Sequence, residues 1–279
     1  MSAGSGFDVR AYMRAPHVLR PSHLDPQAVP TPAPATLATL AHLWCAERGL
    51  LGRLRDVLLT PTHAESRVTA FLTTWSYEQY WLAETLRAVL AAHGPAPQEP
   101  ADTVPGGLLR AWDERLRPTV DAVGTNLLGA DVTGAHMVTS WLDTAVLALH
   151  YRRLGSAEPA LGELTGAVAA LKERHLAFYT EEAATRLAAR AGARRIARVA
   201  TARWSWPGTR YAGPAPARAG AGLLLADPAC RARVAAIDSG AAAFPGLAGI
   251  RPVRTALGRL APRSAEGPAH AVRGTLVLP

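Results

Sequence analysis

The stretch EPALGELTGAVAALKERHLAFY, residues 158–179, decides the fold class of this chain. Glu158-Pro159 at its start is a helix-start signal, because proline fits the first turn of a helix, where its missing N–H costs nothing. The apolar residues that follow recur at a spacing of three or four, as they do on one face of a helix. We therefore predict a long helix from about 158 to 190, with an inner stripe of Leu161, Val168, Lys172, His175 and Tyr179.

Three further segments carry the same spacing, and we predict helices over 36–60, 64–93 and 133–154. Thr60-Pro61-Thr62-His63 separates the first two, since proline removes a backbone donor and interrupts a helix. Their stripes contain large apolar residues typical of a buried face, among them Leu40, Trp44, Leu51, Val68, Leu72, Trp75, Leu82 and Leu86.

The segment between the second and third helices predicts how the helices are connected. Residues 94–106 are rich in proline and glycine, and a short helix near 107–117 belongs to a crossover over 107–130. Two antiparallel helical hairpins joined by a long crossover are typical of one class of four-helix bundle. The sequence thus predicts an all-α bundle domain over residues 36–203.

The two ends of the chain are predicted to lie outside this bundle. Residues 1–35 contain six prolines and no helical period, which indicates an extended, Pro-rich N-terminal arm. After the break at Trp204-Ser205-Trp206-Pro207-Gly208, residues 204–279 are predicted as a C-terminal extension with short helices near 226–237 and 247–260 packed on the bundle. A short strand is expected at 275–278.

Composition narrows the classes of function. Cys45 and Cys230 stand outside any CxxC motif, which argues against a disulfide scaffold or a structural zinc site and favours a cytoplasmic location. The net charge of +8 is carried by arginine, without a nucleic-acid-binding motif, so no nucleic-acid partner is predicted. No signal peptide is visible, and the apolar stretch 132–151 fits a central helix of a soluble bundle better than a membrane span.

A polar residue interrupts the apolar stripe of each predicted long helix at a similar depth. Glu47, Gln79, Asp143 and the pair Lys172 and His175 all lie roughly 17–25 Å from the nearest hairpin turn, at about 1.5 Å of rise per residue. If the hairpins pack together, these side chains meet in one layer. Such a layer is costly inside a bundle unless its members are paired or bind something.

Three segments that hold this layer resemble the ligand-bearing helices of ferritin-like acyl-carrier-protein desaturases and related di-iron oxygenases. They are residues 75–84, residues 140–145 and residues 171–179, and Arg174-His175 with Tyr179 is the most specific part. The resemblance covers residues 36–190. It implies a ferritin-like four-helix bundle, whose members hold two metal ions on a Glu from each of two helices and a Glu-x-x-His from each of the others.

The departures from that pattern imply that the two-metal site has been dismantled. The second-helix Glu and His of the family fall on Gln79 and Leu82, the fourth-helix Glu falls on Lys172, and the third-helix Glu is shortened to Asp143. A protonated amine cannot bind a metal ion and repels one. No cofactor is therefore expected, and the alternative is one iron or manganese ion on the remaining set, Glu47, Asp143 and His175.

Lys172 is the residue on which the functional prediction rests. It is the single lysine in a chain that otherwise uses arginine, and it stands at a ligand position of the family pattern. A titratable amine can act as a general acid or base or form an imine, which a guanidinium cannot. We predict a metal-independent enzyme that cyclises or isomerises a small apolar biosynthetic intermediate, with Lys172, Glu47, Asp143 and His175 as catalytic residues and a pocket formed by Gln79, Leu82, Trp75, Ser140 and Tyr179.

Two other functions stay open at this point. One is an oxidoreductase or oxygenase with a reduced metal site. The other is a non-catalytic binding or scaffold protein, in which Lys172 only neutralises Glu47 and Asp143 within a buried ion cluster. Glu78, one position off the stripe, is interpreted as a flanking or surface residue, and its rotation into the interior is the alternative.

A basic face at the end of the fourth helix suggests a further partner. Four arginines step by four on what is predicted as a continuing helix. They form either a solvated basic face or a docking patch for an acidic acyl carrier protein. A homodimer is left open. The four residues are Arg186, Arg190, Arg194 and Arg198.

Overall fold

The computed structural model describes residues 6–23, 26–27, 29–95, 97 and 129–261. Within these residues the chain is helical, with no strand, which confirms the predicted all-α class. The predicted crossover over 107–130, apart from its last two residues, and the predicted strand at 275–278 lie outside the described residues. In the described part of the chain, no helix has both the length and the apolar character needed to cross a membrane.

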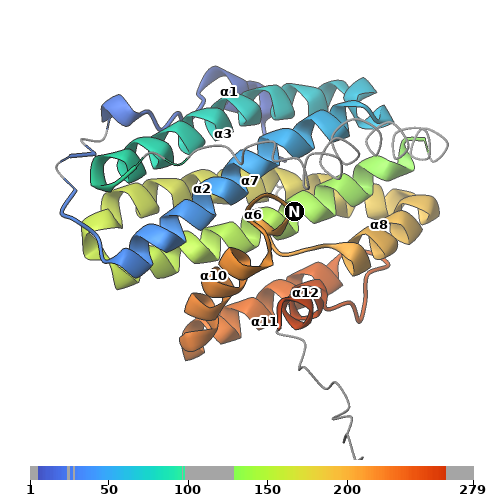
Figure 1. The fold of residues 1–279 in the computed structure, drawn as a ribbon. Helices are drawn as coiled ribbons and strands as arrows, with labels where there is room; N and C mark the ends of the chain where they lie inside the picture. The colour runs from blue at the N-terminus through green and yellow to red at the C-terminus, as the bar shows by residue number, and fades with distance from the viewer. Residues whose placement is uncertain (1–5, 24–25, 28, 96, 98–128, 262–279) are drawn as a thin grey trace, which may run out of the picture.

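Four long helices lie alongside one another and form the centre of the molecule (Figure 1). The first two are joined by a short 3-10 turn and pack closely together, and so do the last two, which gives two antiparallel pairs. Their bounds lie within a few residues of the predicted ones. The elements are α2 (Pro34–Leu58), η2 (Pro61–Ala64), α3 (Ser66–His93), α6 (Asp131–Ala157), η4 (Pro159–Leu161) and α7 (Gly162–Ala189).

The turn between α2 and α3 begins where the sequence predicted. The Thr60 side chain accepts a hydrogen bond from the Thr62 N–H at 3.4 Å, and Pro61 occupies the first position of η2. This satisfies one N–H at the start of the turn, while proline has none to satisfy. The turn therefore reverses the chain directly into α3 and sets α2 and α3 side by side.

The N-terminal arm is more ordered than predicted, because it contains a short helix, α1 (Val9–Arg14), and a 3-10 turn, η1 (Pro21–His23). Asp8 caps α1 by accepting a hydrogen bond from the Ala11 N–H at 3.0 Å. Tyr12 on α1 stacks on Phe71 of α3 at 5.0 Å between ring centroids. Burial of this aromatic side chain holds α1 on the bundle. A segment this short has no helical period, so the sequence did not predict this contact.

The predicted continuation of the fourth helix is wrong. The backbone at Arg190 is extended, with φ −132° and ψ 121°, so α7 ends at Ala189 and a separate helix follows that packs against α6. Two further helices, α9 and α10, were not predicted, whereas α11 and α12 lie near the two expected segments. The helices after the break are α8 (Ala191–Arg203), α9 (Thr209–Ala212), α10 (Pro214–Ala226), α11 (Pro228–Ala243) and α12 (Pro252–Leu260).

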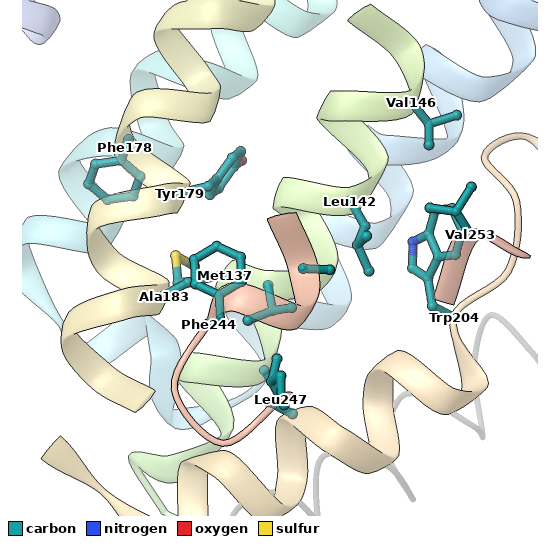
Figure 2. Close-up of a cluster of buried hydrophobic side chains, with 14 of the residues drawn as sticks. Met137, Leu142, Val146, Phe178, Tyr179, Ala183, Trp204, Phe244, Leu247 and Val253 are labelled. Atoms are coloured by element: carbon teal, nitrogen blue, oxygen red, sulfur yellow. The ribbon is translucent and has the colours of Figure 1, made fainter. Parts of the chain in front are cut away.

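The C-terminal helices share a hydrophobic core with the long helices (Figure 2). Trp204, which follows α8, and Phe244, which follows α11, are both buried against residues of α6. Full burial of an aromatic side chain contributes roughly 1.5–3 kcal/mol. The extension is therefore part of the main core, and this arrangement carries Trp204 into the centre of the molecule.

Candidate functional site

Lys172 lies inside the structure and faces the predicted polar layer. Its Nζ is 2.7 Å from Glu47 Oε2, and the two side chains are 1% and 0% exposed. The same ammonium donates to Gln79 Oε1 at 3.2 Å, and Gln79 Nε2 donates both to Glu47 Oε2 and, at 3.1 Å, to the Glu47 carbonyl. Three of the predicted layer residues, from α2, α3 and α7, thus form one buried hydrogen-bonded cluster.

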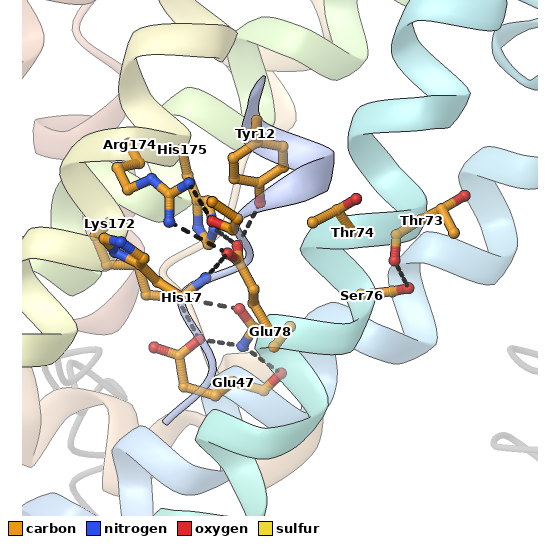
Figure 3. A network of polar contacts seen from close by, with 12 residues as sticks. Tyr12, His17, Glu47, Thr73, Thr74, Ser76, Glu78, Lys172, Arg174 and His175 are labelled. Carbon is orange, nitrogen blue, oxygen red and sulfur yellow. Dashed lines mark hydrogen bonds and ion pairs between the residues drawn. The ribbon is translucent and has the colours of Figure 1, made fainter. Parts of the chain in front are cut away.

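A second buried cluster is centred on Glu78, which is fully buried and not at the surface as predicted (Figure 3). Its carboxylate accepts from the Tyr12 hydroxyl, from the His17 N–H at 2.6 Å and from His175 Nε2 at 2.8 Å. Burial alone would raise the pKa of Glu78, but these donors lower it below the ordinary value. An ionised Glu78 therefore anchors the N-terminal arm to α3.

His175 belongs to this second cluster and does not touch Lys172 through a hydrogen bond in the described structure. Burial lowers its pKa, against the opposing effect of Glu78, so the imidazole is neutral and carries its proton on Nε2 toward the carboxylate. Its Nδ1 is buried without a hydrogen-bond partner. His175 thus serves first to hold Glu78, and its predicted catalytic role stays a prediction.

Asp143 forms a third group, with partners that sequence reasoning missed. Its Oδ1 accepts from the Trp204 indole N–H at 2.8 Å, and its Oδ2 is paired with the Arg53 guanidinium. Arg53 also donates to Thr139 Oγ1 at 2.5 Å. Burial raises the pKa of Asp143, although Arg53 and the indole N–H oppose the rise. A buried carboxyl with a raised pKa and fixed orientation is suited to exchanging a proton.

A pocket lies directly beside this third group, between α2, α3, α6 and α7. Its cavity volume is about 20 Å³, roughly the space that one water molecule needs, so a larger ligand requires side chains of the wall to move apart. Its wall is mostly apolar, with a few polar groups, an arrangement typical of sites that bind apolar molecules in a fixed orientation. The lining residues are Leu50, Arg53, Leu54, Val57, Leu72, Trp75, His136, Met137, Ser140, Asp143, Thr144 and Tyr179.

Two titratable side chains of the pocket stay neutral. Burial raises the pKa of the Tyr179 phenol. Burial and the nearby Arg53 lower the pKa of His136 to about 3, and its Nδ1 lies 3.0 Å from Thr62 Oγ1. The other ionisable side chains on the pocket wall are Asp143 and Arg53, which pair with each other.

The predicted site residues divide between the pocket and the interior behind it. Four of them line the pocket: Trp75, Ser140, Asp143 and Tyr179. The others are buried but are not part of its wall: Lys172, Glu47, His175, Gln79 and Leu82. The residues of the predicted layer are therefore buried, as expected. Of Glu47, Asp143 and Lys172, Asp143 is the one that lines the pocket.

The three residues suggested as ligands for a single metal ion do not form one set. Glu47 is held by Lys172, Asp143 by Arg53, and His175 by Glu78. Among the described residues, no group of three or more His, Cys, Asp or Glu side chains is placed to hold a metal ion. Each candidate ligand thus has its own partner in this structure.

The four arginines proposed as a docking face do not share one helix, because the chain breaks at Arg190. Arg186 pairs with Glu65 at 2.8 Å, and Arg190 pairs with Asp131. Arg194 donates to the Leu187 carbonyl at 2.7 Å, and Arg198 donates to the Ala248 carbonyl at 3.0 Å. These contacts hold neighbouring elements together, so the continuous basic face that motivated an acyl-carrier-protein partner is not formed.

Most of the site residues that were not predicted share one feature, which is that no local sequence pattern links them to the site. Arg53 and Trp204 lie far from Asp143 in the sequence, and Tyr12 lies in a segment without helical period. For Glu78 a signal existed, because it adjoins Gln79 and lies within one helical step of the inner stripe.

Comparison with known proteins assigns no family. No protein-family profile, no curated protein and no solved structure gave a significant match to this chain.

Proposed function

We propose that this chain is an enzyme that binds a small, mainly apolar molecule in the pocket and moves a proton on it, with Asp143 as the general base and acid. A proton-transfer isomerisation next to a carbonyl group is the reaction class that these residues suit best. The observation that carries the proposal is a buried carboxyl with a raised pKa on the wall of an apolar pocket.

The neighbours of Asp143 supply the other parts of such a reaction. Removal of a proton next to a carbonyl places negative charge on the carbonyl oxygen, and a cation or neutral donor close by stabilises that charge. Arg53 and the neutral Tyr179 line the same pocket as Asp143. Asp143 keeps the Trp204 N–H as a partner if Arg53 turns toward a substrate.

The architecture and the residue pattern support a ferritin-like origin for this enzyme. Two antiparallel pairs of long helices carry the polar residues, as they do in that class of bundle. Lys172 occupies the interior against Glu47, at a position where the family pattern has a metal-binding Glu. We therefore propose a metal-independent reaction in which Asp143 transfers the proton and Lys172 has a structural role in the buried cluster. This differs from the catalytic role first predicted for Lys172.

A non-catalytic binding protein is the second candidate, and the contact that favours it is the Asp143–Arg53 ion pair. In a resting ion pair both charges are already satisfied, so the pair can serve only to orient a polar group of the ligand. Under this alternative the protein binds the same class of molecule and returns it unchanged.

One experiment separates these functions. A panel of small apolar ketones and enones is screened by thermal shift, and bound compounds are then incubated with the protein in D2O and followed by NMR. We expect deuterium to enter the carbon next to the carbonyl, and Asp143→Asn to abolish this exchange while the compound still binds. Binding without exchange would leave the binding-protein function, and failure of every compound to bind would refute both.

A further inference from the structure

The Lys172 cluster contains three groups in an arrangement that favours a covalent reaction between side chains. Lys172 Nζ lies 3.2 Å from Gln79 Oε1, the oxygen of a primary amide. Glu47 Oε2 lies 2.7 Å from the same Nζ and also accepts from Gln79 Nε2. One carboxylate therefore touches both the amine and the nitrogen that would leave the amide.

From these contacts we propose that Lys172 and Gln79 become joined by an isopeptide bond, formed by the protein itself with Glu47 as the proton carrier. The product is a covalent link between α7 and α3, and ammonium is released. Such a modification requires an amine, which explains why the single lysine of an arginine-rich chain is found here.

The reaction balances with the groups that are present. Glu47 takes a proton from the Lys172 ammonium, and the freed Nζ lone pair attacks Gln79 Cδ. The Nζ–Cδ bond forms and the Cδ–Nε2 bond breaks. The two protons that Lys172 loses pass through Glu47 to the departing Nε2, which leaves as ammonium, and Glu47 ends as the carboxylate it was at the start. Since no electrons are transferred overall, neither an oxidant nor a reductant is needed.

Burial provides the conditions for this step. All three side chains are almost wholly removed from solvent, so water does not compete with the amine for the amide carbon. The 3.2 Å hydrogen bond also holds the Lys172 amine beside the Gln79 amide, and groups held together in this way react faster than the same groups in solution.

Gln79 is a better acceptor than Glu47 for the amine. A carboxylate carries negative charge that repels a nucleophile, whereas a neutral amide has an electrophilic carbon and a leaving nitrogen that already donates to Glu47. The two possible links differ in the molecule lost, which makes them distinguishable by mass.

The test is the intact mass of the purified full-length chain under denaturing conditions, after incubation at 37 °C. We expect a mass about 17 Da below that of the sequence, because one ammonia is lost. Trypsin should then release residues 68–87 and 154–174 as one cross-linked peptide, with no cleavage after Lys172. An unchanged mass overturns the proposal, and so does a loss of about 18 Da, which would mark a link to Glu47 with release of water.

Variants identify the groups that take part. Lys172→Arg, Gln79→Leu and Glu47→Ala should each restore the mass of their own sequence, whereas Glu84→Gln, at a half-buried position of α3 outside the cluster, should keep the loss. The mass of the unaltered chain decides the matter even if a variant fails to fold. The result is independent of the pocket, because no ligand enters this experiment.

Discussion

Trp204 donates its indole N–H to Asp143 Oδ1 at 2.8 Å, so a residue from the segment after α8 fixes the carboxylate that α6 presents to the pocket. Trp204 is itself buried in the core shared by the long helices and the C-terminal extension. The extension therefore supports the candidate site directly, and its packing and the orientation of Asp143 depend on each other.

Replacing this donor tests the relationship. Trp204→Phe keeps most of the ring but leaves Asp143 Oδ1 without its N–H partner, which should lower the free energy of unfolding by about 1–3 kcal/mol. Chemical denaturation measures the change. The matched control is Trp141→Phe, whose N–H donates to Thr180 at an exposed position and should cost about 0.5 kcal/mol. Equal losses in the two variants would contradict a special role for Trp204.

Overfilling the pocket should block binding. Ser140 lines the pocket from α6, and the larger side chain of Ser140→Phe leaves no room there for a ligand. We expect at least about a tenfold rise in Kd for any ketone that binds the unaltered protein, equivalent to about 1.4 kcal/mol. Isothermal titration calorimetry measures Kd. Ser156→Phe, at an exposed position of the same helix, should leave Kd unchanged, and the proposed pocket is wrong if both variants bind equally well.

Glu78 should be more important for stability than Glu84, a half-buried glutamate on the same helix. Glu78→Gln removes the negative charge from a carboxyl that faces Tyr12, His17 and His175, and breaking such a buried cluster costs about 3–5 kcal/mol. Denaturation measures this loss, and hydrogen exchange should show residues 9–14 losing protection first. For Glu84→Gln, which breaks a surface pair with Arg87, we expect about 0–1 kcal/mol. Retained protection of residues 9–14 in Glu78→Gln would contradict the anchoring role.

Acid should destabilise the fold through a buried pair of histidines. His42 on α2 and His150 on α6 have ring centroids 6.2 Å apart, and their ring nitrogens are buried without hydrogen-bond partners. Burial lowers the pKa of His42 to about 4, and burial together with His42 lowers that of His150 to about 3. Both are therefore neutral in the folded chain at pH 5, where an unfolded histidine, with an ordinary pKa near 6.5, is charged.

Between the folded pKa values of these two histidines and the unfolded value near 6.5, the unfolded state binds more protons than the folded state. The free energy of unfolding is therefore highest above about pH 6.5 and falls as the pH drops toward 4. The loss between pH 7 and pH 5 should be about 2 kcal/mol for each histidine. Urea denaturation at the two pH values measures it. His150→Phe should reduce the difference by that amount, whereas His23→Gln, at an exposed position, should not. An unchanged pH dependence in His150→Phe would refute this assignment.

The sequence by itself determined the helical class, the near-correct bounds of the four long helices and the burial of Lys172, Glu47, Gln79 and Asp143. These follow from spacing along one helix, and a stripe with a period near 3.6 residues must face the interior wherever the helix packs. The same local signals predicted the break at Thr60-Pro61 and the helix start at Glu158-Pro159, since proline acts on the chain next to it.

Only the tertiary structure decided which buried residues meet. The pairing of Asp143 with Arg53 and Trp204, and of Glu78 with Tyr12, joins residues that are 61 to 90 positions apart. Spacing gives the depth of a side chain along its own helix, but not how each helix is rotated about its axis relative to its neighbours. That rotation is set by the packing of whole faces, and it turned Asp143 toward the pocket while Lys172 remained behind it, against Glu47.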